Sequence, residues 1–340
     1  MRNFNEENER IKHDYLTYLR EAKGRDEPTL DKVAAALLEF EEAVGFKPFK
    51  AFHREWASKY KRHLELRRNA RTGKPLGLST RDASLRIAKK FIEWLAFQKG
   101  FRSRVSHADA EYFNNRMKDA RVAHAQRTIR YPSMEQCDHA FRMMPEGSEI
   151  ERRNKAMFAL LVLTGARAAA ATSLLLKHVD LVEGMIFQDA REVKTKASKT
   201  FETWFFPVDP MYREVFERWV RHLREERLYG PSDALFPKQL VEVRDWRFAR
   251  SGLSREPYSN TQTINAVFAA AFVSAGLPGF TPHSIRKTLA MLMDKYCTTM
   301  EERKAWSQNL GHEELATTVS AYMPVSRDRQ RDLLRSIVGE

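Results

Sequence analysis

Six polar side chains along the sequence have chemical types that could together act on a phosphate. An arginine follows the turn Thr164-Gly165-Ala166, a lysine lies in a lysine-rich stretch, and a histidine and an arginine lie three residues apart. A second histidine follows Leu310-Gly311, and a tyrosine comes ten residues later. Guanidinium and imidazole groups bind phosphate oxygens, and a tyrosine phenol is a nucleophile. The set suggests that a nucleic-acid backbone is broken and rejoined through a phosphotyrosine, without a metal. Its members are Arg167, Lys196, His283, Arg286, His312 and Tyr322.

Each of these residues also has an ordinary structural explanation. Arg167 could pair with a distant carboxylate, although no acidic residue lies between Glu151 and Asp180. His283 and Arg286 could be surface cations on an ordinary helix, and most tyrosines are packing residues. Lys194 and Lys196 are predicted in a β-hairpin, where alternation places them on the same side of a strand. The sequence therefore leaves open which of the two lysines could act as a general acid.

Helices are expected to position most of the six residues. Thr281 and Pro282 predict a helix that runs to residue 296, so His283 and Arg286 share one face at the positive end of its dipole. Arg167 is predicted at the start of an alanine-rich helix, where backbone N–H groups favour a phosphate. Further helices are expected after Ser133 and at 154–163, 211–228, 259–275 and 313–322. The predicted β region comprises 185–187, 191–194 and 200–208.

The first part of the chain is predicted to be helical and basic. Helical spacing predicts one helix that Thr29 caps and Gly45 ends, and another that Ser79 caps and Gly100 ends. Residues 51–100 contain 13 Lys and Arg against 4 Asp and Glu. Binding to DNA phosphates requires such a concentrated basic surface, and a merely solvated face is the alternative. Candidate DNA contacts are Lys59, Arg62, Arg67, Arg68, Arg71, Lys74, Arg81, Arg86, Lys89 and, from the hairpin, Lys194.

Composition favours a soluble protein of two domains with a polyanionic partner. The chain has 340 residues, of which 43% are hydrophobic, and a formal net charge of +13. That length exceeds most single cores. Cys137 and Cys297 suggest neither a disulfide framework nor a cysteine metal site. The N-terminal residues show no signal-peptide pattern, and the apolar segment 156–176 has Gly165 and Arg167 at its middle. We therefore expect an intracellular protein with a buried helix–turn–helix there, not a membrane span.

The ordered motifs resemble those of the tyrosine recombinase (phage integrase) family. The resemblance covers about residues 130–330 and rests on four motifs. It implies a mainly α fold, with a helical-bundle core-binding domain at 1–126. A mixed α+β catalytic domain with a small antiparallel sheet and a C-terminal tail would follow at 127–340. This is the DNA breaking-rejoining enzyme fold. The motifs are Thr164-Gly165-Ala166-Arg167, Lys194-Thr195-Lys196, His283-x-x-Arg286, and Leu310-Gly311-His312 with Thr317-Thr318 before Tyr322.

The resemblance also implies a role for each of the six residues. Tyr322 would form a 3′-phosphotyrosyl bond, and Arg167 and Arg286 would bind the non-bridging phosphate oxygens. His283 would act as the base toward the tyrosine, and His312 would add a hydrogen bond to the phosphate. Lys196 would protonate the departing 5′ hydroxyl. The bond energy stays in the phosphotyrosine, so neither ATP, a metal nor another cofactor is expected.

The resemblance implies double-stranded DNA at specific recombination sites as the partner. A homo-tetramer on synapsed DNA, in a cytoplasmic, nucleoid-associated setting of a prokaryote, phage or mobile element, is the expected working form. Ala170 and Lys287 depart from the family's usual residues at their positions. A type IB topoisomerase or telomere-resolving enzyme with the same chemistry is the alternative enzyme. A DNA-binding regulator that keeps the fold without turnover is the alternative that is not an enzyme.

Overall fold

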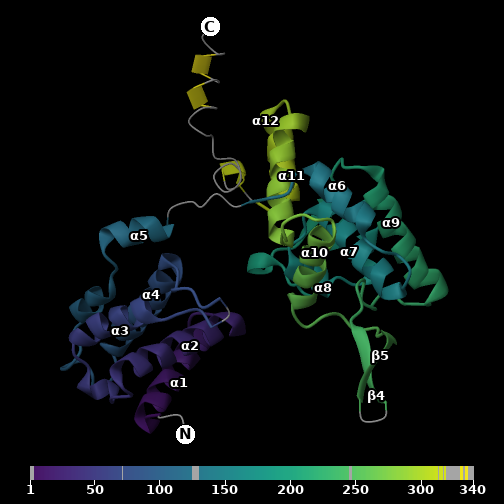
Figure 1. Ribbon diagram of the computed structural model, residues 1–340. Coiled ribbons are helices and arrows are strands. Elements are labelled where there is room, and N and C mark those ends of the chain that lie inside the picture. The colour runs from purple at the N-terminus through teal and green to yellow at the C-terminus, as the bar shows by residue number, and fades with distance from the viewer. Residues whose placement is uncertain are drawn as a thin grey trace. The chain divides into compact units, whose positions relative to one another are not determined.

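The computed structural model describes residues 4–70, 72–124, 130–244, 247–312, 314–316, 318, 330–331 and 334–335. The chain divides into two compact units, residues 1–127 and 128–340 (Figure 1). Assigning a core-binding role to the first unit and a catalytic role to the second stays a prediction.

Helices make up the regular structure described in the first unit. They enclose an aromatic core in which Phe40 lies 5.2 Å from Tyr60, and Phe49 lies 5.0 Å from Phe91, measured between ring centroids. All four rings are fully buried. In chain order the elements are α1 (Glu6–Glu21), α2 (Glu27–Val44), η1 (Phe49–Ala51), α3 (Glu55–Leu66), α4 (Leu78–Leu95), η2 (His107–Phe113) and α5 (Met117–His124).

The two predicted helix caps of this unit are wrong. The carboxylate of Asp26 caps α2 by accepting a hydrogen bond from the N–H of Thr29 at 3.1 Å, so Thr29 lies inside the first turn. Helix α4 follows Gly77 without a side-chain cap, and Ser79 is its second residue. Gly45 does end α2, in the left-handed conformation with φ 70°. Asp, Ser and Thr are all good caps, so the sequence pattern did not choose between neighbours.

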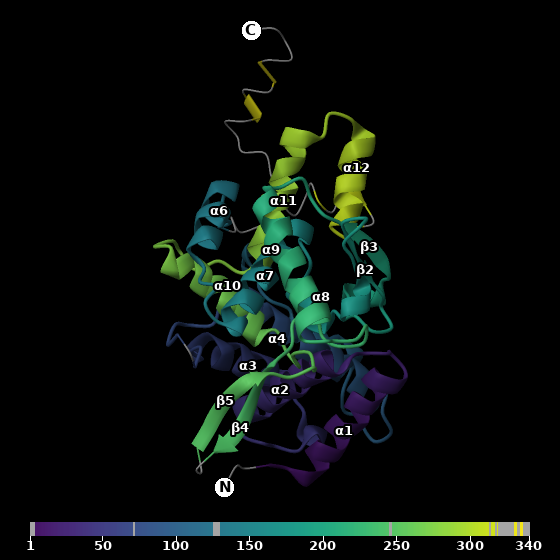
Figure 2. The ribbon, with the colours of Figure 1, turned by 90° about the vertical axis from the view of Figure 1, so that its right-hand side faces the viewer.

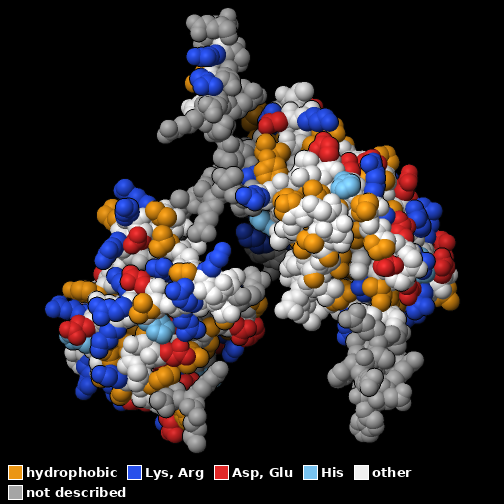
Figure 3. Space-filling model, in the orientation of Figure 1, with side chains coloured by type: hydrophobic (Ala, Val, Ile, Leu, Met, Phe, Trp, Pro, Cys, Tyr) orange, Lys and Arg blue, Asp and Glu red, His pale blue; other side chains and the backbone are white. Residues whose placement is uncertain are grey.

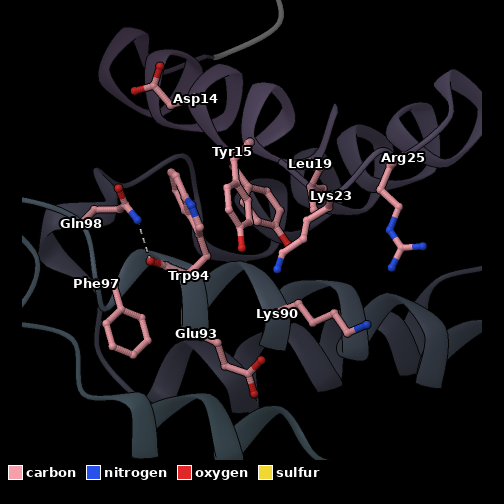
Figure 4. Close-up of a pocket in the computed structure, with 11 residues that line it drawn as sticks. Asp14, Tyr15, Leu19, Lys23, Arg25, Lys90, Glu93, Trp94, Phe97 and Gln98 are labelled. Carbon is pink, nitrogen blue, oxygen red and sulfur yellow. Dashed lines mark hydrogen bonds between the residues drawn. The ribbon is translucent and has the colours of Figure 1, made fainter. Parts of the chain in front are cut away.

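An open hollow lies between α1 and α4 in this unit. Its volume is about 890 Å³. Figure 4 shows the rings of Tyr15 and Trp94 at its centre, with Lys23 and Lys90 beside them. Lys23 lies over the ring of Tyr18, with 5.5 Å between Nζ and the ring centroid.

The second unit surrounds helix α7, whose residues 156–164 are all buried. The apolar segment therefore forms a buried helix, a turn and a second helix, as predicted. No described helix is long and apolar enough to cross a membrane. The elements are α6 (Met134–Met143), α7 (Glu149–Thr164), α8 (Ala168–Ser173), η3 (Leu176–His178), β1 (Val179–Asp180), β2 (Met185–Gln188), η4 (Lys196–Ser198), β3 (Phe201–Trp204), α9 (Pro210–Arg221), η5 (His222–Glu226), β4 (Gln239–Arg244), β5 (Arg247–Leu253), α10 (Gln262–Ser274), α11 (Pro282–Tyr296) and α12 (Met300–Asn309).

A three-stranded antiparallel sheet has the order β1-β2-β3, with Ile186 opposite Thr203. The strand predicted at 191–194 is absent, because Asp189 turns the chain. Its carboxylate accepts from the N–H of Arg191 at 2.9 Å, and its carbonyl accepts from the N–H of Val193 at 2.7 Å. The lysines of this region therefore lie in the connection from β2 to β3. The strand alternation expected for them does not apply.

A second antiparallel pair, β4 and β5, was not predicted. It pairs Val243 with Phe248 and extends away from the helices of its unit in Figures 1 and 2. The alternation of apolar and charged residues from Val241 to Arg244 was the available signal. Helices α1, α3 and α12 were also missed.

Candidate active site

A glycine turn places Arg167 at the start of α8. Gly165 ends α7 with φ 59°. A Cβ atom at this position would lie 2.9 Å from Cδ2 of Leu310 and 3.0 Å from Cδ1 of Leu289. Left-handed backbone and this close packing both favour glycine. The turn that carries Arg167 is thus fixed against two other segments of the unit.

The guanidinium of Arg286 joins segments that are far apart in sequence. Arg286 lies in α11 and is 3% exposed. Its Nη1 donates to the carbonyl of Gly165, 121 residues away, and its Nη2 donates to the carbonyl of Leu310, 24 residues away. Nη2 also contacts Nε2 of His312 at 3.3 Å. A buried charge requires polar partners of this kind, so one cation holds together three of the predicted motifs.

The segment before His312 is fixed against the sheet. Gly311 has φ 71°, and a Cβ atom there would lie 2.8 Å from Cζ of Phe201 in β3. The side chain of Asn309 accepts from the N–H of Trp204 at 2.7 Å and donates to its carbonyl at 2.9 Å. Asn309 therefore pairs with the edge of β3 as a neighbouring strand would. Figure 2 shows β3 beside α12.

The two candidate lysines have different surroundings. The N–H of Lys194 donates to Oγ of Ser173 in α8 at 2.8 Å, which attaches the lysine segment to the helix that follows Arg167. The ammonium of Lys194 donates to the carbonyl of Ser259 at 3.1 Å. Lys196 begins η4 and is exposed.

Both imidazoles experience the same positive charges. Partial burial, followed by the charges of Arg286, Arg167 and Lys196, lowers the pKa of His283. Burial lowers the pKa of His312 to about 4, and the same three cations act in the same direction. The five residues therefore form one electropositive cluster in which both imidazoles are neutral near pH 7.

Residues 134–329, more than half of the chain, match the phage integrase family. The chain belongs to the phage integrase family. Two curated relatives are bacterial tyrosine recombinases named XerC. That of Lactobacillus delbrueckii subsp. bulgaricus is 27% identical over 179 residues, covering 52% of this chain and 52% of the relative. That of Halalkalibacterium halodurans is 24% identical over 190 residues, covering 56% and 55%. The chain thus spans about half the length of these relatives.

Solved structures of integrases have the same fold. The Tn1549 transposon integrase in complex with a circular intermediate DNA matches with a TM-score of 0.61 and 14% identity, covering 96% of this chain and 99% of that chain. A lambda integrase dimer bound to a COC′ core site matches with a TM-score of 0.55 and 16% identity, covering 94% and 96%. The predicted fold class, mainly helical with small antiparallel sheets, is confirmed.

Two predicted residues lie outside the described part of this integrase-family chain, namely Tyr322 and Arg71. The predicted helix at 313–322 is also largely outside it. Lys287, a departure from the family pattern, points its ammonium at the ring of Tyr131, with 4.7 Å between Nζ and the ring centroid. Among the described residues no cluster of His, Cys, Asp or Glu could hold a metal ion.

The predicted DNA contacts of the first unit lie on or near its surface. Lys and Arg side chains are spread over the face of this unit that Figure 3 shows. Lys59, Arg62, Arg68 and Lys74 are exposed, whereas Arg81 is half-buried and donates to a backbone carbonyl. Three others have carboxylate partners: Arg67 with Glu39 and Glu42, Arg86 with Asp82, and Lys89 with Glu93 and Glu111.

Two residues that position the cluster were missed in the sequence. Asn309 attaches α12 to β3, and Ser307 lies within 2.6 Å of Thr318, measured between hydroxyl oxygens. Both lie within three residues before Leu310-Gly311-His312, so proximity to that motif was the signal. Their partners are distant in sequence or lie across a turn, which spacing does not indicate.

Proposed function

We propose that this chain is a site-specific DNA recombinase that cleaves and rejoins DNA through a phosphotyrosine. In this proposal the phenol oxygen of Tyr322 attacks the phosphorus, a 3′-phosphotyrosyl bond forms, and the bond to the 5′ oxygen breaks. Rejoining is the reverse attack by a 5′ hydroxyl. The phosphate bond is exchanged and not hydrolysed, so the reaction requires no ATP. No metal is assigned a step.

The two arginines bind the phosphate in this proposal. Arg167 and Arg286 donate to the non-bridging oxygens, whose charge grows in the transition state. Donors fixed in advance toward such a charge are usually the largest contribution to catalysis. The carbonyl bonds of Arg286 support this role, because they hold the guanidinium in place before DNA arrives.

Two proton transfers accompany the exchange. His283 takes the phenol proton, and its lowered pKa keeps the imidazole neutral and able to accept it. Lys196 gives a proton to the departing 5′ oxygen. Lys196 is preferred to Lys194 because its charge reaches both imidazoles, whereas the ammonium of Lys194 is bonded to Ser259.

One observation carries the proposal. The guanidinium of Arg286 connects the turn before Arg167, the helix of His283 and the segment of His312. A DNA-binding regulator needs positive charge, but it does not need cations and neutral imidazoles gathered around one buried arginine.

We further propose that the first unit binds the DNA backbone and that four chains act on two DNA sites. The exposed cations of the first unit support binding to the DNA backbone. A lambda integrase tetramer bound to a Holliday junction matches this chain with a TM-score of 0.55, which supports the action of four chains. Particle masses measured on and off DNA would test the tetramer.

Trapping the covalent intermediate tests the chemistry. Selection from a random duplex library gives a DNA site that the chain binds. A version nicked near the scissile phosphate releases a short fragment on cleavage and prevents rejoining. We expect a protein–DNA adduct that survives denaturation in the wild type and is absent in Tyr322→Phe.

The proposal fails if the bound site yields no adduct, and the chain is then better described as a DNA-binding regulator. Adduct formation without recombination between paired sites, together with relaxation of a single supercoiled plasmid, would instead identify a topoisomerase.

A further inference from the structure

A chain of buried hydrogen bonds leads from the cluster to two hydroxyl groups. Nδ1 of His312 lies 2.7 Å from Oγ1 of Thr318, which lies 2.6 Å from Oγ of Ser307. Nε2 of the same imidazole faces Nη2 of Arg286 at 3.3 Å. The exposed fractions are 8% for His312, 0% for Thr318 and 1% for Ser307.

Arg286 sets the donor and acceptor roles of the His312 imidazole in these hydrogen bonds. A guanidinium can only donate, so Nε2 of His312 accepts and the ring hydrogen lies on Nδ1. That hydrogen is donated to the hydroxyl oxygen of Thr318. The hydroxyls of Thr318 and Ser307 share a second hydrogen bond, in which either oxygen can be the donor. Burial of the ring, followed by the charges of Arg286, Arg167, Lys196 and Lys199, disfavours a second ring proton, so the imidazole is neutral.

Ser307, at the far end of these hydrogen bonds, lies in a helix that is attached to α11. It lies in α12, and the indole N–H of its neighbour Trp306 donates to the carbonyl of Leu289 in α11 at 2.9 Å. Helix α12 is therefore attached to the helix that carries Arg286. At the other end, Thr318 precedes Tyr322 by four residues. The hydroxyl pair connects Thr318 to α12.

We propose that Thr318 and Ser307 are positioning residues that hold His312 in the Nδ1–H tautomer. This inference rests on the proposed function for its effect on the reaction. In this tautomer Nε2 has no hydrogen, so His312 donates to a phosphate oxygen only after it takes up a proton. Thr318 accepts the Nδ1 hydrogen in both the neutral and the protonated ring. It therefore orients the ring throughout.

Thr318→Val tests the proposal, because valine keeps the volume of threonine and removes the hydroxyl. Thr318→Ser restores the hydroxyl and is the matched control. ¹⁵N NMR of histidine-labelled protein reports the tautomer, and the His312 signals are identified by their loss in His312→Gln. We expect the Nδ1–H pattern in the wild type and in Thr318→Ser. In Thr318→Val we expect a mixture or the Nε2–H form.

Adduct formation under single-turnover conditions gives a second measurement. Groups that orient a metal-ligating imidazole typically account for about 10–100-fold in metal affinity or activity, and we expect an effect of the same order for His312. We expect a loss of this size in Thr318→Val at saturating DNA, DNA affinity within about twofold of the wild type, and recovery in Thr318→Ser. A merely structural role would instead lower the melting temperature and DNA affinity and leave the tautomer of the folded fraction unchanged.

Retention of the Nδ1–H pattern and of the wild-type adduct rate in folded Thr318→Val would overturn the inference. If that variant does not fold, Ser307→Ala decides, because losing the hydroxyl that is hydrogen-bonded to Thr318 should change the same signals in the same direction. The NMR measurement needs no DNA. If the wild type forms no adduct but the tautomer changes as expected, the proposed function fails and the positioning of the ring stands.

Discussion

Positive side chains are held in different ways in the two units. In the second unit Arg286 is 3% exposed, and its hydrogen bonds go to backbone carbonyls and a buried imidazole. In the first unit Arg86 is exposed, and its partner is the carboxylate of Asp82 at 2.9 Å. Carbonyls of the folded backbone fix a cation in one position, whereas an exposed ion pair is worth little and exchanges readily.

The difference indicates two uses of positive charge. A fixed guanidinium suits stabilisation of a transition state, since it costs no rearrangement during the reaction. Exposed cations suit affinity for a polyanion, because they release counterions and tolerate many local geometries. Changes in the second unit should therefore act on rate and folding, and changes in the first unit on affinity and its salt dependence.

Lys196 is the strongest test of this contrast, because it is exposed yet belongs to the cluster of the second unit. We expect Lys196→Ala to slow adduct formation by about 10²–10⁴-fold, the usual contribution of a general acid. A DNA substrate with sulfur in place of the bridging 5′ oxygen should recover most of the rate, since a thiolate leaves without a proton. Lys194→Ala is the control and should retain a rate near that of the wild type. Equal losses in the two variants, with no recovery by sulfur, would contradict the assignment.

Two glycines with nearly equal φ angles allow the packing of the two units to be compared. Gly165 has φ 59°, and a Cβ atom added there would have side-chain atoms within 3.0 Å, whereas Gly24 in the first unit has φ 57° and nothing within 4 Å of that position. We expect Gly165→Ala to lower the free energy of unfolding by about 2–4 kcal/mol, from left-handed strain plus overpacking. Gly24→Ala should lower it by about 1–2 kcal/mol, from strain alone. Urea denaturation measures both, and equal losses would show that packing around Gly165 is not tight.

The imidazole of His312 makes the stability of the second unit depend on pH. Its pKa is about 4 in the folded protein against 6.5 for an ordinary histidine. Between these values the unfolded chain binds a proton that the folded chain does not. The contribution of His312 to the free energy of unfolding is therefore fully present above pH 6.5. It is lost as the pH falls toward 4, by about 3 kcal/mol in total. Urea midpoints at pH 7.5 and pH 4.5 measure the loss. His312→Gln should reduce it, and an unchanged loss in that variant would refute the assignment.

Substitution of exposed cations in the first unit should have the smallest effect, and it should act on DNA affinity alone. We expect Lys59→Gln, Arg62→Gln and Lys74→Gln each to reduce the slope of log affinity against log salt by about 0.9, provided that the side chain contacts one phosphate. The adduct rate at saturating DNA should not change. Fluorescence anisotropy from 50 to 300 mM salt measures the slope. A reduced rate at saturating DNA would show that the first unit also contributes to the chemistry.

Local patterns predicted much of the second unit. Helix α11 runs from Pro282 to Tyr296 as expected, and Ser133 caps α6 in a capping box with Gln136. These features depend on residues within one or two turns of each other, which a sequence displays directly. The predicted strand at 191–194 was wrong because a side chain–backbone bond of Asp189 closed a turn that alternation does not reveal.

The order and chemical types of the six residues are properties of the sequence, and they sufficed to indicate phosphate chemistry and the family. Two features of the site depended on contacts between distant residues. One is the convergence of three motifs on the guanidinium of Arg286, across separations of up to 121 residues. The other is the separation of Lys194 from Lys196, which follows from the bond of Lys194 to Ser259. Spacing fixes which side chains share a helix face, because backbone geometry repeats every few residues. It does not determine which carbonyl a buried cation meets, because that depends on how whole elements pack.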